Sequence, residues 1–169
     1  MESNYAEENI STEQPPPREK ARERGVETVV VERNGRPRVE HDAKIISELR
    51  KRGVELVCLA GYMRLLSAEF VRAFPDRIIN IHPSLLPDFP GLDAQKQAFE
   101  AGVKVTGCTV HYVDELLDHG EVILQREIER LPDDTVETLS ERILEQEHKL
   151  YIEAIKKIFT TETRRTQSG

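Results

Sequence analysis

The sequence predicts an α/β fold, in which helices pack on a sheet that begins with parallel strands and ends with antiparallel ones. Two observations support this class. Segments with helical periodicity alternate with short apolar segments, in the order β-α-β-α-β-α-β-β-α. Residues 54–60, VELVCLA, form a nearly continuous apolar run, which is typical of a central parallel strand covered on both faces.

Start and stop signals mark the individual elements. A short helix over 18–24 is expected to end at Gly25, and the β-branched segment ETVVVE, residues 27–32, is expected to form a strand. A helix over 40–52 carries its apolar residues on one stripe and ends before Gly53. After the strand at 54–60 we expect, in order, a helix at 67–74 capped by Ser67, a strand at 77–82, a proline-rich loop at 83–91, a helix at 93–101, strands at 106–113 and 122–128, and a helix at 135–159.

Both ends of the chain have compositions typical of disorder. Residues 1–19 are rich in Glu, Ser, Asn, Gln and Pro, and residues 160–169 read TTETRRTQSG. Such segments bury too little apolar surface to offset the entropy lost on ordering. We therefore expect one folded domain over residues 20–159, flanked by two disordered tails.

The charge and the cysteine content argue against several classes of protein. Lys and Arg total 24 and Asp and Glu total 31, so the net charge is −7, which disfavours binding to nucleic acid or to an anionic membrane. No stretch approaches the ~18 apolar residues of a membrane span. Cys58 and Cys108 both lie in apolar segments, which favours buried free thiols in a reducing compartment. The expected location is the cytoplasm.

The segment that ends the strand at 77–82 carries residues suited to catalysis. Side chains two apart on a strand share a face, so Asn80 and His82 point the same way at the carboxyl end, where open α/β sheets bind ligands. An asparagine amide can donate to a developing oxyanion, and a histidine is a general acid or base near neutral pH. The alternative is a buried structural histidine beside a turn asparagine.

An acidic segment follows the strand at 106–113 and contains Asp118. This carboxylate can reach back to His82 and orient it, as in a catalytic triad, or it can belong to a solvated acidic turn. A metal site built from His82, His111, His119 and Asp118 is a further alternative. No two of these residues have a standard zinc-ligand spacing, so we expect no metal.

Several separated motifs, in one order over residues 20–159, resemble the phosphoribosylglycinamide formyltransferases. They are Leu59 to Leu66, Asn80 to Pro87, Phe89-Pro90-Gly91, Gly107 to Val113 with Asp118 and Gly120, and Gln146-Glu147-His148. The resemblance implies a three-layer, Rossmann-like formyltransferase fold. It also implies transfer of a formyl group from 10-formyltetrahydrofolate, a consumed cosubstrate, to the amine of glycinamide ribonucleotide in purine (IMP) biosynthesis. The formyltetrahydrofolate hydrolases share the Asn-x-His…Asp core, so hydrolysis of the formylfolate is an alternative.

The resemblance also assigns roles to single residues. It implies that His82 is the acid and base, that Asn80 binds the formyl oxygen, and that Asp118 stabilises the protonated histidine. The implied folate-binding residues are Arg38, Met63, Arg64, Leu65, Leu66, Asn80, Val113, Asp114 and Glu115. The implied ribonucleotide contacts are Gly61, Ile81 and Glu147, the last to the ribose hydroxyls.

The sequence departs from the family at two places. The family begins with a strand and a Gly-rich loop that holds the substrate phosphate at a helix N-terminus, and no such motif precedes residue 20. We therefore expect an N-terminally truncated sheet whose exposed edges favour self-association, and folate binding without tight ribonucleotide binding. A catalytically impaired folate-binding remnant is a further alternative. Asp93 stands where the family usually has histidine.

Overall fold

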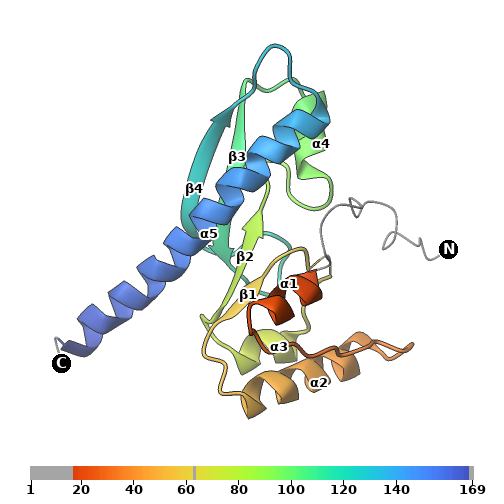
Figure 1. Ribbon diagram of the computed structural model, residues 1–169, viewed down its shortest axis with the longest axis vertical. Coiled ribbons are helices and arrows are strands. Elements are labelled where there is room, and N and C mark those ends of the chain that lie inside the picture. Colours follow the sequence, from red (N-terminus) through yellow and green to blue (C-terminus); the bar gives the residue numbers. More distant parts are fainter. Residues whose placement is uncertain (1–16, 63, 168–169) are drawn as a thin grey trace. The chain divides into compact units, whose positions relative to one another are not determined.

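The computed structural model describes residues 17–62 and 64–167, in two units formed by residues 1–35 and 36–169 (Figure 1). In the first unit, α1 (Pro17–Glu23) ends as expected at Gly25, whose φ of 69° suits a helix terminus. The predicted disordered tail at 1–19 is wrong at its end, because 17–19 are helical and proline is favoured in a first helical turn. The rest of that tail lies outside the described residues.

The segment ETVVVE, residues 27–32, forms no strand. Val29 and Val30 are 46% and 55% exposed. Strand propensity measures how well a side chain packs on neighbouring strands, and the sheet consists of four other segments. The prediction of a strand here is therefore wrong.

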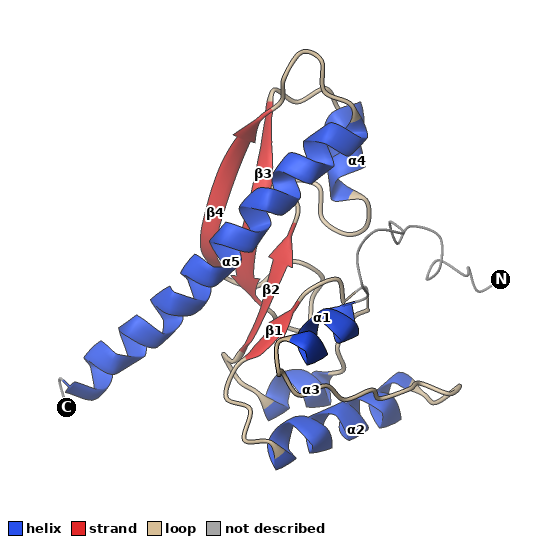
Figure 2. Cartoon of the chain, in the orientation of Figure 1, coloured by secondary structure: helices blue, strands red, loops and turns tan. Residues whose placement is uncertain are grey.

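The second unit contains a mixed four-stranded sheet in the order β1-β2-β3-β4 (Figure 2). Its strands are β1 (Val57–Leu59), β2 (Ile78–His82), β3 (Val105–Tyr112) and β4 (Val122–Glu129). β1 and β2 are parallel, whereas β3 is antiparallel to both β2 and β4. The expected order of parallel strands followed by antiparallel ones is confirmed.

β1 is an edge strand of this sheet, so the expectation of a central strand covered on both faces is wrong. Cys58 is exposed, whereas Cys108 is buried as expected. An apolar run alone does not show which strands will flank it, because the chain topology decides that. Self-association through the edges formed by β1 and β4 stays a prediction.

The helices of this unit are α2 (Arg38–Lys51), α3 (Ala68–Ala73), α4 (Ala94–Glu100) and α5 (Val136–Gln167). The Ser67 side chain caps α3 by accepting from the amide of Phe70, as the sequence predicted. α5 continues to Gln167, so the predicted disordered tail at 160–169 is wrong over 160–167. No Gly or Pro occurs between Val136 and Gly169, and extending an existing helix costs far less than nucleating one.

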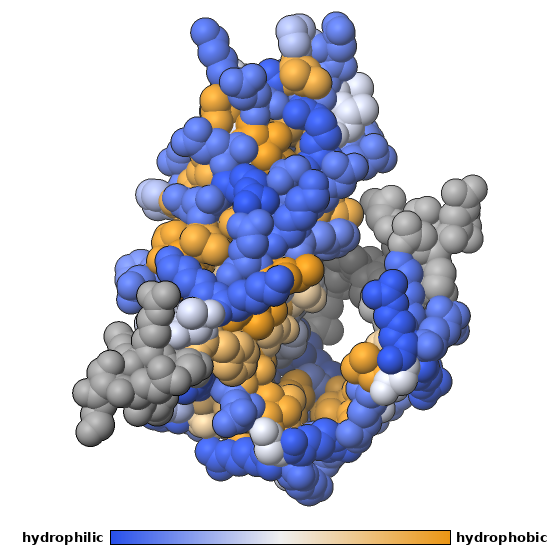
Figure 3. Space-filling view, turned by 60° about the vertical axis from the view of Figure 1, so that its left-hand side comes forward, coloured by the Kyte–Doolittle hydropathy of each residue, from blue (hydrophilic) through white to orange (hydrophobic). Residues whose placement is uncertain are grey.

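The sheet separates two apolar clusters, which gives a three-layer arrangement. On one face, Ile79, Cys108 and Val110 pack against α5. On the other face, Val57 and Ile78 pack with residues of α2 and α3. The space-filling view shows a mostly hydrophilic surface with separate apolar patches (Figure 3). Among the described helices, none combines the length and apolarity needed to cross a bilayer.

Candidate active site

Four polar side chains lie on the sheet face opposite α5. Asn80 and His82 come from β2, and Thr109 and His111 come from β3. The antiparallel register places Asn80 opposite His111 and His82 opposite Thr109, and paired residues share a face. The odd-numbered residues of β2 and the even-numbered residues of β3 therefore pack against α5, and these four face away from it.

One ring nitrogen of His82 is fixed by a hydrogen bond, and the other lies next to a carboxylate. Its side chain is only 6% exposed, and Nε2 lies 2.9 Å from the carbonyl oxygen of Phe89. Because a carbonyl can only accept, Nε2 carries a hydrogen and donates it. Nδ1 lies 3.4 Å from Oδ2 of Asp118. Nδ1 is therefore the ring atom left to exchange a proton with a bound molecule, and the carboxylate lies beside it.

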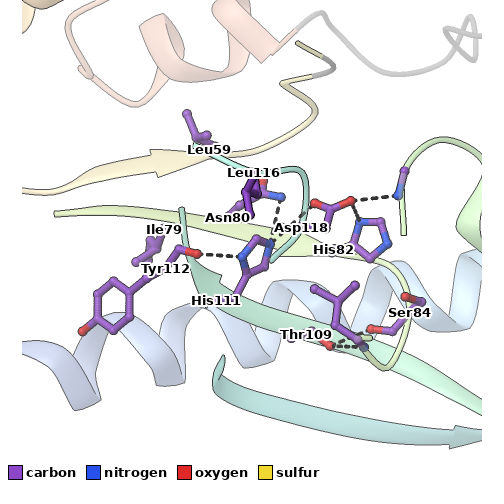
Figure 4. Close-up of polar contacts among 12 residues, drawn as sticks. Leu59, Ile79, Asn80, His82, Ser84, Thr109, His111, Tyr112, Leu116 and Asp118 are labelled. Atoms are coloured by element: carbon purple, nitrogen blue, oxygen red, sulfur yellow. Dashed lines mark hydrogen bonds and ion pairs between the residues drawn. The ribbon is translucent and has the colours of Figure 1, made fainter. Parts of the chain in front are cut away.

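Asp118 reaches the histidine from the loop between β3 and β4 (Figure 4). Its Oδ2 accepts a hydrogen bond from the amide of Gly91 at 2.8 Å, and its Oδ1 lies 3.7 Å from Nε2 of His111. The carboxylate side chain is 8% exposed, so the alternative of a solvated acidic turn is wrong. The φ of Asp118 is +48°, a conformation that Asp tolerates better than most residues.

The loop that follows β2 is held by hydrogen bonds to its backbone. The hydroxyl of Ser84 donates to the carbonyl oxygens of Asp88 and Phe89, at 2.5 and 3.3 Å. The hydroxyl of Thr109 donates to the carbonyl of Ser84 and accepts from the amide of Leu86. These bonds place the Phe89 carbonyl at His82, a backbone contact that residue identity alone does not reveal.

Gly120 fits the Asp118 loop against the end of β3. A Cβ atom at residue 120 would lie 1.8 Å from the carbonyl oxygen of Tyr112, which no side chain tolerates without a shift. The backbone at this end of the strand is paired, since the amide of Tyr112 donates to the backbone carbonyl oxygen of Glu121 at 2.9 Å. The missing side chain of Gly120 therefore lets the loop return close enough for Asp118 to reach His82.

His111 also belongs to the site, although the sequence suggested for it only the alternative role of a metal ligand. Its Nδ1 lies 2.8 Å from the carbonyl of Tyr112, and its Nε2 lies 3.4 Å from Nδ2 of Asn80. Burial lowers the pKa of His111, which favours the neutral ring. The alternation along β3 places this residue on the same face as Thr109. Only the register with β2 shows that it meets Asn80.

The predicted folate-binding residues lie in two groups. The first group lies near Tyr62. Burial and the charge of Asp42 raise the pKa of this tyrosine. The nearby guanidinium groups of Arg64 and Arg38 oppose that rise. Met63 lies outside the described residues. In the same segment, Gly61 and Leu65 are exposed and Leu66 is buried.

The second group lies in the loop after β3. Val113 is half-buried and Glu115 is exposed, while both carboxylate oxygens of Asp114 are engaged, with the amide of Leu116 and with Nδ1 of His119, each at 2.8 Å. Burial acts to raise the pKa of Asp114, but these hydrogen bonds outweigh it and lower the pKa. Within the described residues, no three His, Cys, Asp or Glu side chains are placed to hold a metal ion together.

The structure does not bring Ile81 and Glu147 to the same face as His82. Ile81 packs into the cluster under α5, and the charge of Glu147 acts on Cys108 in that layer. Burial raises the pKa of Glu147 to about 7. A single ligand that contacts both Glu147 and Asn80 therefore has to reach from the α5 side of the sheet to the opposite face.

Comparisons with known proteins agree with this architecture. A family model described as formyl transferase matches residues 10–155. Over 114 residues, the chain is 56% identical to the phosphoribosylglycinamide formyltransferase of Bacillus subtilis (strain 168), an alignment that covers 68% of this chain and 58% of that protein. It is 46% identical over 138 residues to the trifunctional purine biosynthetic protein adenosine-3 of Drosophila melanogaster, covering 81% of this chain and 10% of that protein.

Two solved structures are similar over most of the chain. Glycinamide ribonucleotide transformylase 1 from Symbiobacterium toebii is 53% identical with a TM-score of 0.79, covering 81% of this chain and 65% of that one. Phosphoribosylglycinamide formyltransferase from Streptococcus pneumoniae TIGR4 is 39% identical with a TM-score of 0.80, covering 83% and 79% of the two chains. The chain thus spans between a tenth and four-fifths of these relatives' lengths.

Proposed function

This chain belongs to the formyl transferase family, and we propose that it transfers a formyl group from 10-formyltetrahydrofolate to the amine of glycinamide ribonucleotide, a step of purine (IMP) biosynthesis. The observation that carries the proposal is the arrangement of His82, Asp118 and Asn80 on one sheet face. Relatives that are named phosphoribosylglycinamide formyltransferases support the choice of substrates.

Asn80 stabilises the charge that develops at the formyl group. Nδ2 carries two hydrogens, and one of them is directed to Nε2 of His111. The second hydrogen is left to donate to the formyl oxygen as the amine attacks the carbonyl carbon. Removing one such donor costs roughly 10²–10³-fold in turnover in enzymes that stabilise an oxyanion.

His82 and Asp118 move the proton. The Phe89 carbonyl fixes Nε2–H, so the mobile proton is at Nδ1, next to Asp118. In the imidazolium form both ring nitrogens donate, one to the carbonyl and one to the carboxylate, which stabilises the charged ring. His82 thus donates a proton to the departing folate nitrogen and accepts one from the attacking amine.

The residues that flank the site suit a folate. Nη2 of Arg64 is buried and makes no hydrogen bond within the described residues, which fits a carboxylate-bearing ligand such as the glutamate of a folate. Leu65 and Leu116 are 45% and 59% exposed, and they offer apolar surface to aromatic rings. We assign Arg38, Arg64, Leu65, Leu66 and residues 113–115 to this ligand.

The proposed ribose contact lies on the α5 side of the sheet, away from the face that carries Asn80 and His82. Glu147 is the candidate partner for the ribose hydroxyls, with Gly61 and Ile81 as further candidate contacts. The free thiols of Cys58 and Cys108 fit a reducing location, and we propose the cytoplasm.

A direct test is to identify the products by mass spectrometry. The 169-residue chain is incubated with 10-formyltetrahydrofolate, with and without a large excess of glycinamide ribonucleotide, because ribonucleotide binding is expected to be weak. We expect formylated ribonucleotide and deformylated folate, formed only when both substrates are present, and a roughly 10²–10³-fold slower reaction for Asn80→Ala. Deformylation without ribonucleotide would instead indicate a hydrolase, and the absence of both products would exclude the proposed activity.

A further inference from the structure

His111 has only one hydrogen-bonding arrangement that satisfies both of its ring nitrogens when the ring is neutral. Nδ1 lies 2.8 Å from the Tyr112 carbonyl oxygen, which can only accept, so Nδ1 carries the hydrogen. A neutral imidazole has a single N–H, so Nε2 presents a lone pair. That lone pair faces the side-chain amide of Asn80 at 3.4 Å.

The lone pair of His111 determines which way the amide of Asn80 is turned. An acceptor at Nε2 attracts the Nδ2–H of Asn80 and repels its Oδ1. With the amide in this orientation, a second Nδ2–H remains available for a ligand. With the opposite orientation, Asn80 would offer an acceptor at that place and could not stabilise a developing oxyanion.

We propose that His111 is a positioning residue for the proposed formyl transfer: its neutral Nδ1–H tautomer holds the side-chain amide of Asn80 in the orientation that donates to the formyl oxygen. The inference rests on the proposed function of the site. The backbone supports this role, because the β3–β4 register shifts between Val110 and His111, and such irregularities redirect side chains next to active sites. His111 itself is 2% exposed.

The groups that face His111 decide whether it stays neutral. Oδ1 of Asp118 lies 3.7 Å from Nε2, outside hydrogen-bond distance, and Asp114 and His82 also act on the ring. The two carboxylates favour the cation, whereas burial and His82 oppose it. Protonation at Nε2 would turn that atom into a donor, which would face the Nδ2–H of Asn80 and reverse the amide.

The first experiment compares two substitutions in two backgrounds. His111→Gln places a side-chain oxygen where Nε2 accepts, and His111→Leu removes the acceptor at similar size. We expect His111→Leu to lower kcat about tenfold or more with little change in KM, and His111→Gln to stay within about threefold of the wild type. In an Asn80→Ala background, His111→Leu should cost less than about twofold, because the amide that it positions is gone.

Two results of this experiment would overturn the proposal. One is an equal loss from His111→Leu in both backgrounds, and the other is a loss from His111→Gln as large as that from His111→Leu. Lys96→Gln, an exposed substitution on α4, is the control and should leave kcat unchanged.

A second experiment needs no turnover and so separates this inference from the proposed function. In ¹⁵N NMR of the wild-type chain near neutral pH, His111 should show the pattern of the Nδ1–H tautomer. The side-chain amide signals of Asn80 should move in His111→Leu and much less in His111→Gln. An Nε2–H tautomer, a charged ring, or Asn80 signals insensitive to His111→Leu would contradict the proposal even if the chain is an active transferase.

Discussion

Oδ2 of Asp118 lies 3.4 Å from Nδ1 of His82 and accepts, at the same time, a 2.8 Å hydrogen bond from the amide of Gly91. One carboxylate oxygen thus joins the β3–β4 loop, the loop after β2 and the end of β2. The carbonyl of Phe89, two residues before Gly91, holds the other nitrogen of the same histidine. The loop after β2 therefore positions the histidine and its carboxylate together.

Asp118→Asn tests the charge of this carboxylate separately from its shape. The amide oxygen can take the place of Oδ2 and still accept from Gly91, so the loop should stay in place. The imidazolium of His82 would lose its counter-charge, and kcat should fall by roughly 10²-fold or more. Steady-state kinetics measures this loss, and Asp133→Asn in an exposed turn is the control. Full activity of Asp118→Asn would exclude an electrostatic role for the residue.

Gly120→Ala tests whether a close backbone approach places Asp118. The added Cβ would overlap the Tyr112 carbonyl, so the loop must move away from β3. We expect a loss of about 1–3 kcal/mol in the free energy of unfolding by urea denaturation, with a loss of activity. Gly102→Ala at the end of α4 has open space for its Cβ but a φ of +69°, so it should also lose stability while it keeps its activity. An equally active Gly120→Ala variant would show that the approach is unimportant.

Glu147→Gln tests the half-buried carboxyl on α5. Burial raises the pKa of Glu147 from 4.5 to about 7, so the folded state holds its proton where the unfolded state has lost it. The free energy of unfolding should therefore fall as pH rises from about 4.5 to about 7, by up to about 3 kcal/mol.

Urea denaturation at several pH values measures this dependence. The free energy of unfolding of Glu147→Gln should match that of the wild type near pH 4.5 and exceed it near pH 8, because the neutral amide carries no charge into this half-buried position. Glu145→Gln, on the exposed part of the same helix, is the matched control. A Glu147→Gln variant with the same pH dependence as the wild type would contradict the assignment.

The sequence predicted the elements whose signals are local. Ser67 marks the start of α3, Gly25 the end of α1, and the alternation of Asn80 and His82 places both side chains on one face of β2. Each of these signals depends on the conformation of a few neighbouring residues. Residue identity and spacing were therefore sufficient for most of the element order and for part of the candidate site.

Features that depend on the pairing of distant segments were not predictable in this way. The β-branched segment at 27–32 forms no strand, and the position of β1 at an edge leaves Cys58 exposed. The contact between His111 and Asn80 requires the β2–β3 register, and the face on which Glu147 lies depends on how α5 packs. None of these is set by the local sequence.

The turnover of His82→Ala tests the proposed mechanism most directly. The rate of ribonucleotide-dependent formyl transfer is compared among the wild type, His82→Ala and Lys96→Ala, which truncates an exposed side chain on α4. If His82 moves the proton, kcat of His82→Ala should fall by at least roughly 10²-fold, while Lys96→Ala matches the wild type. A His82→Ala variant that folds and turns over within about twofold of the wild type would contradict the assignment of His82 as the acid and base.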